Sequence, residues 1–430
     1  MRTGSGLRWR IVWILFLSTV TNYIDRQTFS LLAPVISTEL HFSHEDLSRV
    51  FGSFQLAYAW TWLIGGVILD VIGTRAGLSL AVIWWSAASA LTGFANSVRT
   101  FSVCRFLLGI GEGFNWPGAS KAVADWFPAR ERGLAVAIFD SGSSVGAAIA
   151  AVTIPLLSLV LGWRRVFLLS GVLGLIWLVV WLKNYYPRSR HPKLTREEAG
   201  LIDEDGTRVS QKLPFFPALK QVVKSRNAWG ILLGRSLTDP MWWFFVFWLP
   251  QYLSEARGFG LKQIAVFAWI PFAAADAGNF TGGWISGRLI RAGMPVLRAR
   301  KWVCVASCVP MLASIPAVLV HDPIWAIALI CIALWGYASW STMGLTFPSD
   351  LFHESVVGTV TGLSGFGAGM AGTAVTLAVG RIVDRFSYVP AFLFVTALPL
   401  LATLSVLALI RPIAAEGEQT GSTSGGKRQF

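Results

Sequence analysis

Long apolar segments separated by short polar ones run through the whole chain. With a window of about 19 residues, this pattern predicts two sets of six membrane-spanning helices with a longer polar break between the sets. The predicted spans are 9–33, 49–71, 76–95, 100–124, 133–160, 165–183, 228–254, 263–290, 299–319, 323–347, 355–379 and 388–410. A helix needs about 20 mostly apolar residues to cross a bilayer. The sequence therefore predicts an all-α membrane protein with twelve transmembrane helices in two pseudo-symmetric six-helix halves.

The polar break sets the expected organisation of the chain. We expect an N-terminal half at 1–183, a basic cytoplasmic linker at 184–227, a C-terminal half at 228–411 and a disordered cytoplasmic tail at 412–430. A weak internal repeat supports two halves. Its copies follow the second and the eighth span, and they are Gly66, Asp70, Gly73 and Arg75 in the first and Gly283, Gly287, Arg288 and Gly293 in the second. Secondary transporters are commonly built from such repeats, with the site between them.

Composition and charge agree with a membrane protein. Of the 430 residues, 54% are hydrophobic and only 14% are charged, against about 25% charged in soluble domains. The 36 Lys and Arg exceed the 23 Asp and Glu, and they concentrate at the N-terminus, in the linker, in short turns on the same side and in the tail. By the positive-inside rule, both termini are expected to be cytoplasmic in a multi-pass protein of the cell (inner) membrane. This sidedness also accounts for the basic charge without nucleic-acid binding.

Other classes of protein find little support. The four cysteines, Cys104, Cys304, Cys308 and Cys331, lie in apolar stretches without a C-x-x-C pair. The histidines His41, His44, His191, His321 and His353 fall in loops or at span ends without metal-ligand spacing. We therefore expect no metal, no cofactor and no enzyme. The two-half layout also fits alternating access better than a channel, while a sensor without flux stays an alternative.

Four charged residues inside the predicted spans carry most of the functional information. They are Asp25, Arg26, Arg105 and Glu112. A charge inside the membrane is costly and usually functional. Arg105 and Glu112 are seven residues apart, which places them on one helix face, and Asn115 continues that face. The functional interpretation is a cavity with both signs, in which a guanidinium binds a carboxylate and desolvated carboxyls carry protons. The structural alternative is a buried Asp25–Arg105 or Arg26–Glu112 pair that locks two helices.

Further polar and aromatic residues leave two interpretations open. Asp140 either lines the cavity or bonds to the small residues that follow it. Arg235 and Asp239, four residues apart, can satisfy each other, and Asp276 has no obvious partner. The sequence does not separate functional from structural roles for these four residues. The aromatic residues at 242–244 indicate either a platform for a sugar ring or ordinary packing.

Several motifs in the same order resemble those of the major facilitator superfamily and, within it, the anion:cation symporter family. They are Asn22-Tyr23-Ile24-Asp25-Arg26, Gly66…Asp70…Gly73…Arg75, Arg105-Phe106…Gly111-Glu112 and Trp126-Phe127-Pro128…Glu131-Arg132. The segments 112–118, 139–146 and 237–244 look like those of hexuronate transporters. The resemblance covers nearly the whole chain.

The resemblance implies a proton-coupled symporter that imports a hexuronate such as galacturonate or glucuronate, as a monomer driven by the proton gradient. The implied substrate-binding residues are Arg26, Tyr23, Asn115, Ser143, Trp242 and Trp243. The implied proton-coupling residues are Asp25, Glu112 and Arg105, and the implied gating motif is Gly66, Asp70, Gly73 and Arg75. This chain has Ser143 and Ser364-Gly365 where galactonate carriers of the family have a glutamine and an asparagine. Galactonate, glucarate and similar anions are the alternative substrates.

Overall fold

The computed structural model describes residues 6–203, 215–352 and 354–412. His353, residues 204–214 of the predicted linker and residues 413–430 of the predicted tail lie outside the described residues. Within these ranges the chain is helical and contains no strand.

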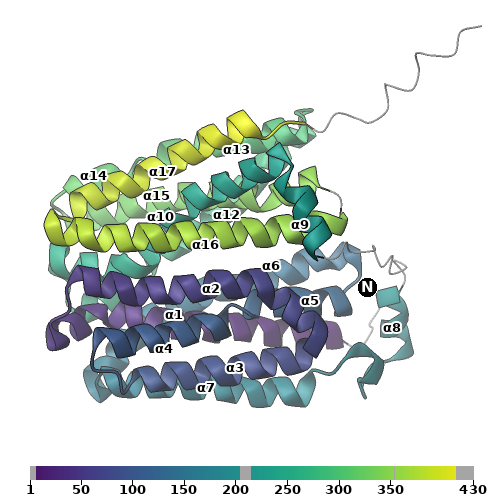
Figure 1. Cartoon of the computed structure of the whole chain (residues 1–430), viewed down its shortest axis with the longest axis horizontal. Helices are drawn as coiled ribbons and strands as arrows, with labels where there is room; N and C mark the ends of the chain where they lie inside the picture. Colours follow the sequence, from purple (N-terminus) through teal and green to yellow (C-terminus); the bar gives the residue numbers. More distant parts are fainter. Residues whose placement is uncertain (1–5, 204–214, 353, 413–430) are drawn as a thin grey trace, which may run out of the picture.

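Two sets of long helices account for most of the chain. The first set is α1 (Leu7–Leu40), α2 (His44–Ile72), α3 (Thr74–Thr92), α4 (Val98–Glu112), α5 (Asn115–Trp126), α6 (Ala129–Leu161) and α7 (Trp163–Asn184). The second set is α10 (Arg226–Arg257), α11 (Leu261–Phe267), α12 (Ile270–Arg291), α13 (Val296–Met311), α14 (Ser314–Leu319), α15 (Pro323–Leu351), α16 (Glu354–Arg385) and α17 (Tyr388–Leu409). Figure 1 shows them as two layers, α1–α7 below and α10–α17 above. Every predicted span coincides with a helix or a helix pair.

Three predicted spans are broken, which the hydrophobic pattern does not predict. The fourth divides into α4 and α5, the eighth into α11 and α12, and the ninth into α13 and α14. The segment between the two sets is also partly helical, with a short η1 (Arg188–Arg190), α8 (Arg196–Asp203) and α9 (Phe215–Val223). A sliding window averages over about 19 residues and therefore passes over breaks of two residues.

Three helices that carry buried charge are less apolar than the other long helices. Eight described helical segments are long and apolar enough to cross a membrane. The helices α1, α3, α4 with α5, and α10 are not among them, and α1, α4 and α10 hold three buried pairs of charged residues, Asp25 with Arg26, Arg105 with Glu112, and Arg235 with Asp239. The polar residues that lower their hydropathy are therefore inside the protein, where other helices supply their partners.

Capping residues and glycines explain where several helices begin. The Ser43 hydroxyl accepts a hydrogen bond from the Asp46 backbone N–H and starts α2 with a capping box, and Ser97 does the same for α4. Gly73 (φ +81°) and Gly293 (φ +93°) occupy the left-handed region in the turns after α2 and α12. Glycine adopts a positive φ without the strain that a side chain adds, so each copy of the sequence repeat has a glycine where its turn requires one.

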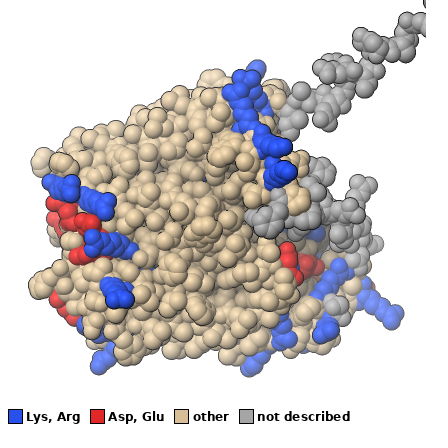
Figure 2. Space-filling view, viewed as in Figure 1, with Lys and Arg blue, Asp and Glu red and all other residues tan. Residues whose placement is uncertain are grey.

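The two sets contact each other where α2 packs on α16, α1 packs on α10, and α6 packs on α11 and α12. The visible face between the two ends of the molecule has almost no charged side chains, whereas Lys, Arg, Asp and Glu gather at the ends (Figure 2). This distribution is that of a protein whose middle is surrounded by hydrocarbon.

The two ends of the molecule differ in how the sets contact each other. We call the end with the N-terminus, α8 and α9 the linker end, and the opposite end the closed end (Figure 1). At the closed end, His44 Nε2 lies 2.6 Å from Glu255 Oε2 and His44 Nδ1 lies 2.6 Å from Asp384 Oδ1. Ser30 Oγ also donates to the Val246 carbonyl at 2.7 Å.

The linker end has no such connection in the described part of the chain. The added methyl group of an alanine at Gly66, Gly283 or Gly362 would find no neighbour within 4 Å. By contrast, a methyl group at Gly369 would meet Ala59 at 2.5 Å. The bonds and close contacts between the two sets in the described residues therefore lie from the middle of the molecule to the closed end.

Candidate functional site

Arg26 lies at the centre of the polar residues in α1. Its side chain is 2% exposed, and its Nη2 lies 2.9 Å from Glu112 Oε2 on α4. Arg26 Nε donates to the same oxygen at 3.0 Å, and Nη2 donates to Asn22 Oδ1 at 3.0 Å. Of the two pairings that the sequence left open, the structure contains Arg26–Glu112.

Aromatic rings surround the Arg26 guanidinium on several sides. Its carbon lies 4.6 Å from the ring centres of Tyr23 and Tyr58, 5.2 Å from Phe54 and 5.7 Å from Trp243. Trp243 belongs to α10 of the second set, so the cage is closed by both sets. Such rings stabilise a cation and exclude water, which makes Arg26 a strong electrostatic site for an anion.

Phe54 and Tyr58 are members of the cage that the sequence analysis did not identify. They are four residues apart on α2, and Trp62 follows after four more, with its ring 5.7 Å from Tyr58. This i, i+4 aromatic series inside a span is the signal that would have predicted a ring-lined helix face.

Asp25 points away from Arg26 toward α3 and α7. The hydroxyl of Ser89 donates to Asp25 Oδ1 at 2.8 Å and lies 2.8 Å from the Ser170 hydroxyl, while Asp25 Oδ2 has no partner. Arg105 Nη2 donates to the Arg26 carbonyl at 3.1 Å and makes no ion pair with Asp25. The two predicted coupling carboxyls are therefore both buried, but in different surroundings.

The other predicted substrate residues contact neighbours within their own sets. Trp242 stacks on Tyr337 at 5.7 Å, one residue from the cage member Trp243. Ser143 is half-buried and donates to the carbonyl of Asp140. The Asn115 amide is fully buried, accepts from Ser18 Oγ at 2.5 Å and donates to Thr19 Oγ1 at 3.2 Å. In this structure Asn115 thus joins α1 to α5.

A second polar group links the two sets near Ser143. The indole N–H of Trp116 donates to Asp140 Oδ1 at 3.0 Å, and Ser144 Oγ donates to Asp276 Oδ1 on α12 at 2.5 Å. Asp276, for which the sequence offered no partner, is therefore bonded across the contact between the sets. Sequence spacing gives no information about this pairing, because the two residues are 132 positions apart.

Arg235 and Asp239 form a buried ion pair within α10. Arg235 Nη2 lies 2.6 Å from Asp239 Oδ2, and the Tyr337 hydroxyl donates to Asp239 Oδ1 at 3.3 Å. The ion pair that their spacing suggested is therefore present. Together with Arg26–Glu112 in the first set, it gives each set a buried ion pair.

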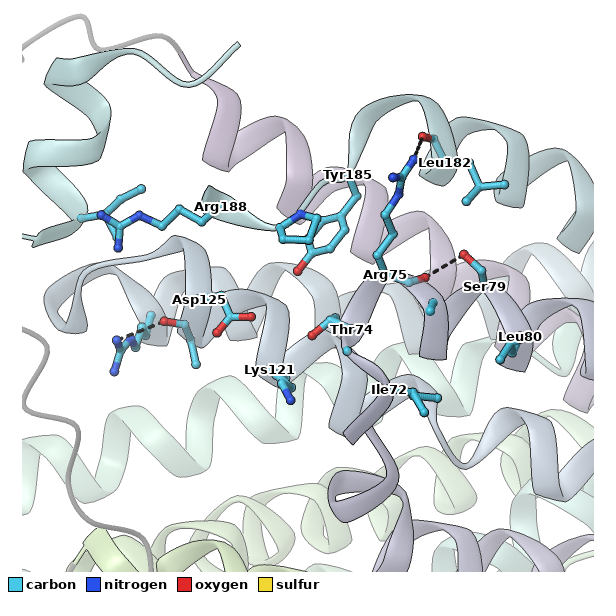
Figure 3. A pocket seen from close by; sticks show the side chains of 16 residues that line it. Ile72, Thr74, Arg75, Ser79, Leu80, Lys121, Asp125, Leu182, Tyr185 and Arg188 are labelled. Atoms are coloured by element: carbon cyan, nitrogen blue, oxygen red, sulfur yellow. Dashed lines mark hydrogen bonds between the residues drawn. The ribbon is translucent and has the colours of Figure 1, made fainter. Parts of the chain in front are cut away.

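The glycine motif after α2 lies at the linker end beside a cavity of about 940 Å³. Asp70 forms an ion pair with Lys121 on α5, and Arg75 Nη2 donates to the Leu182 carbonyl at 2.7 Å. Figure 3 shows Arg75, Lys121 and Arg188 around this cavity, together with Asp125. The motif thus ties α2, α3, α5 and α7 together within the first set.

The described residues contain no group of three His, Cys, Asp or Glu side chains placed to hold a metal ion. The four cysteines are free thiols. What the arrangement offers is a buried cation paired with one carboxyl, a second buried carboxyl nearby and a ring-lined contact between two helical sets.

Comparisons with known proteins agree with this geometry. A model of the Major Facilitator Superfamily matches residues 15–376. The chain is 32% identical over 413 residues to a hexuronate transporter of Escherichia coli K12, with 96% of each chain covered. It is 30% identical over 426 residues to a probable galactarate/D-glucarate transporter of Bacillus subtilis, covering 95% of this chain and 93% of the relative.

Solved structures support the same fold. The crystal structure of a bacterial homolog of the human lysosomal transporter Spinster, in an inward-facing, unoccupied conformation, superposes with a TM-score of 0.70. The alignment covers 94% of this chain and 95% of that one at 19% identity. At this identity the likeness concerns the fold alone.

Proposed function

The chain belongs to the Major Facilitator Superfamily, and from this premise we propose that it is a proton-coupled symporter that imports a hexuronate by alternating access. The family and the relatives make it a multi-pass membrane transporter of the sugar-acid class, and not an enzyme. The choice of a hexuronate, the coupling to protons and the inward direction are our proposals.

The observation that carries the proposal is the Arg26–Glu112 pair inside its aromatic cage. Arg26 presents Nε and Nη2 to one carboxylate oxygen, and this edge of a guanidinium also binds the carboxylate of a ligand. Glu112 and a sugar acid would therefore compete for the same edge. A substrate carboxylate gains access when Glu112 takes up a proton and loses its attraction to Arg26.

This competition supplies a physical basis for coupling. A buried cation without a partner is strongly disfavoured, so Arg26 is paired either with ionised Glu112 or with the substrate. Loading of the proton and of the acid then occur together. Asp25, buried beside Ser89, is the second proton carrier, and Arg105 interacts electrostatically with both acids.

The remaining predicted contacts extend the site from Arg26. Tyr23 and Trp243 pack on the guanidinium. Trp242, which is next to Trp243 and stacks on Tyr337, and Ser143 on α6 would bind the sugar ring and hydroxyls. Asn115 would contribute after its bonds to α1 rearrange. With the linker end cytoplasmic, as the positive charge predicts, the structure corresponds to an inward-facing state. The motif of Gly66, Asp70, Gly73 and Arg75 would then act when the linker end closes.

Another organic anion is the second candidate. The relative from Bacillus subtilis is named for galactarate and glucarate, which carry two carboxylates, and galactonate also has a carboxylate for Arg26. We favour a hexuronate because the hexuronate relative is similar over 96% of both chains.

Uptake by purified protein in lipid vesicles tests the proposal. Labelled galacturonate and glucuronate are supplied with and without an inward proton gradient, to wild-type protein and to Arg26→Ala. We expect accumulation that depends on the gradient and is lost in the variant. Asp322→Asn, which keeps a residue able to cap α15, is the control. Absence of uptake of both acids would refute the hexuronate proposal.

A further inference from the structure

Asp140 and Asp276 bring two carboxylates together from the two sets. Asp140 on α6 accepts the Trp116 indole N–H, and Ser144, one turn later on α6, donates to Asp276 on α12. Residues four apart share one face of a helix, so the Asp276 carboxylate that Ser144 binds lies on the same face of α6 as the Asp140 carboxylate. Neither of them forms an ion pair within the described residues. This is an uncompensated negative region at the contact between the sets.

An aromatic layer joins this region to Arg26. The Trp116 ring meets Tyr23 edge-on with their centres 5.9 Å apart, and Tyr23 packs on the Arg26 guanidinium at 4.6 Å. Two rings therefore separate the cation from Asp140. The region around the proposed substrate site has a positive end at Arg26 and a negative end at Asp140 and Asp276.

Unused hydrogen-bonding groups lie at the positive end. Asn22 Nδ2 and Glu112 Oε1 are buried and have no partner, and both residues bond to Arg26 through their other atom. Gln55 Nε2, on the cage helix α2, is also buried without a partner. Buried polar atoms nearly always find partners in native proteins, so these groups indicate where a polar ligand binds.

Sugar acids differ in what they would present to the negative end. A hexuronate or aldonate bound by its carboxylate to Arg26 has no second charged group, and its hydroxyl groups can donate to carboxylates. An aldarate has a second carboxylate at its other end, which two aspartates repel at short range. The distinction follows from the charge of the ligand and holds for any sugar diacid of similar length.

We infer that Asp140 and Asp276 form a charge filter that admits sugar acids with one carboxylate and rejects those with two. The inference rests on the proposed function, because it assumes that Arg26 holds the first carboxylate. Asp140 and Asp276 are then specificity-determining residues, with Trp116 and Ser144 fixing their positions.

Competition measurements in vesicles test the filter. Uptake of labelled galacturonate is inhibited by unlabelled galacturonate or galactarate, and the ratio of the two half-inhibitory concentrations is measured. For wild-type protein we expect galactarate to be at least tenfold weaker. Asp276→Asn and Asp140→Asn keep the shape of the side chain and remove its charge, and each should reduce the ratio at least fivefold. Asp322→Asn, the same substitution at the start of α15, should leave the ratio unchanged.

Binding and folding are measured on the same preparations. Thermal unfolding in detergent with each acid reports binding without turnover, and galactarate should stabilise Asp276→Asn more than wild-type protein. The two substitutions are independent, so either folded variant is sufficient for the test.

The outcomes separate this inference from the proposed function. Suppose that all three proteins take up galacturonate and have the same ratio of half-inhibitory concentrations. This result overturns the filter and leaves the hexuronate proposal standing. Equal inhibition of wild-type protein by galacturonate and galactarate would also overturn the filter and leave the hexuronate proposal standing. Absence of galacturonate uptake overturns both.

Discussion

Arg26 and Glu112 are 86 residues apart in sequence, and Arg26 Nη2 lies 2.9 Å from Glu112 Oε2 in the interior of the first helical set. Both side chains are almost completely buried. Their contact joins α1 to α4 and orients the guanidinium within its aromatic cage. The competition between Glu112 and substrate for this guanidinium is the central claim of the proposed mechanism.

Glu112→Gln removes the proton-accepting group and keeps the shape of the side chain. Glutamine resembles protonated glutamate, so Arg26 stays available to a carboxylate. We expect exchange of galacturonate across vesicles without a gradient to persist, and accumulation driven by a proton gradient to be lost. Full gradient-driven accumulation by this variant would refute the role of Glu112 in coupling.

Arg26→Lys keeps the positive charge and loses the paired N–H groups of the guanidinium. Hydrogen bonds to charged groups contribute about 1.5–3 kcal/mol, so galacturonate affinity should fall roughly 10- to 100-fold. Arg26→Ala should bind no measurable substrate. Titration calorimetry on purified protein measures both, and wild-type affinity in the lysine variant would show that the guanidinium geometry is unimportant.

Gly109 on α4 is closely packed against α2, whereas Gly66 on α2 has open space beside it. A methyl group at Gly109 would meet the backbone carbonyl oxygen of Phe54, whereas one at Gly66 meets nothing within 4 Å. Gly109→Ala should destabilise the protein by about 1–3 kcal/mol and disturb the cage. Gly66→Ala should keep wild-type stability. Thermal unfolding in detergent compares them, and equal unfolding temperatures would contradict the packing of α2 against α4.

His44 holds the closed end together through its contacts with Glu255 and Asp384. His44→Ala should raise the rate at which a maleimide labels Ser48→Cys, because opening exposes this buried position. Arg49→Ala, which removes ion pairs within α2 only, is the matched control. Equal labelling in both variants would show that His44 does not hold the two sets together.

The same contact predicts a pH dependence. Both ring nitrogens of His44 face a carboxylate, and both donate only when the imidazole is protonated. Its ring neighbours are Trp248 and Tyr388, and the Tyr388 hydroxyl donates to Glu255. Alkaline buffer removes the proton from His44. The thiolate is the reacting form of a cysteine, so each labelling rate is divided by that of a free thiol at the same pH. This normalised rate for Ser48→Cys should increase with pH when His44 is present and remain constant in His44→Ala.

The hydrophobic pattern was sufficient to predict the positions of the twelve spans, because each span is fixed by its own composition, but it did not predict the breaks within three of them or the short helices of the linker. It also identified Asp25, Arg26, Arg105 and Glu112, since charges inside apolar segments are conspicuous. It did not determine their partners. The choice between Arg26–Glu112 and Asp25–Arg105 depends on how α1 and α4 are rotated about their axes, and packing against several other helices sets that rotation.

Long-range contacts explain the other omissions. Asp276 gains its partner Ser144 from the opposite set. Phe54 and Tyr58 join the cage because α2 packs against α4, which carries Glu112. Asn115 shows the converse: its place on the Glu112 face was predicted, but its bonds to Ser18 and Thr19 were not. Helix periodicity describes one helix at a time and contains no information about its neighbours.

Proton movement accompanying substrate addition tests the central claim most directly. Vesicles containing the protein and a luminal pH dye are mixed with galacturonate in the absence of an imposed gradient. The account predicts acidification of the lumen in step with galacturonate uptake for wild-type protein, and none for Glu112→Gln although exchange continues. Galacturonate uptake by wild-type protein without any change in luminal pH would contradict it.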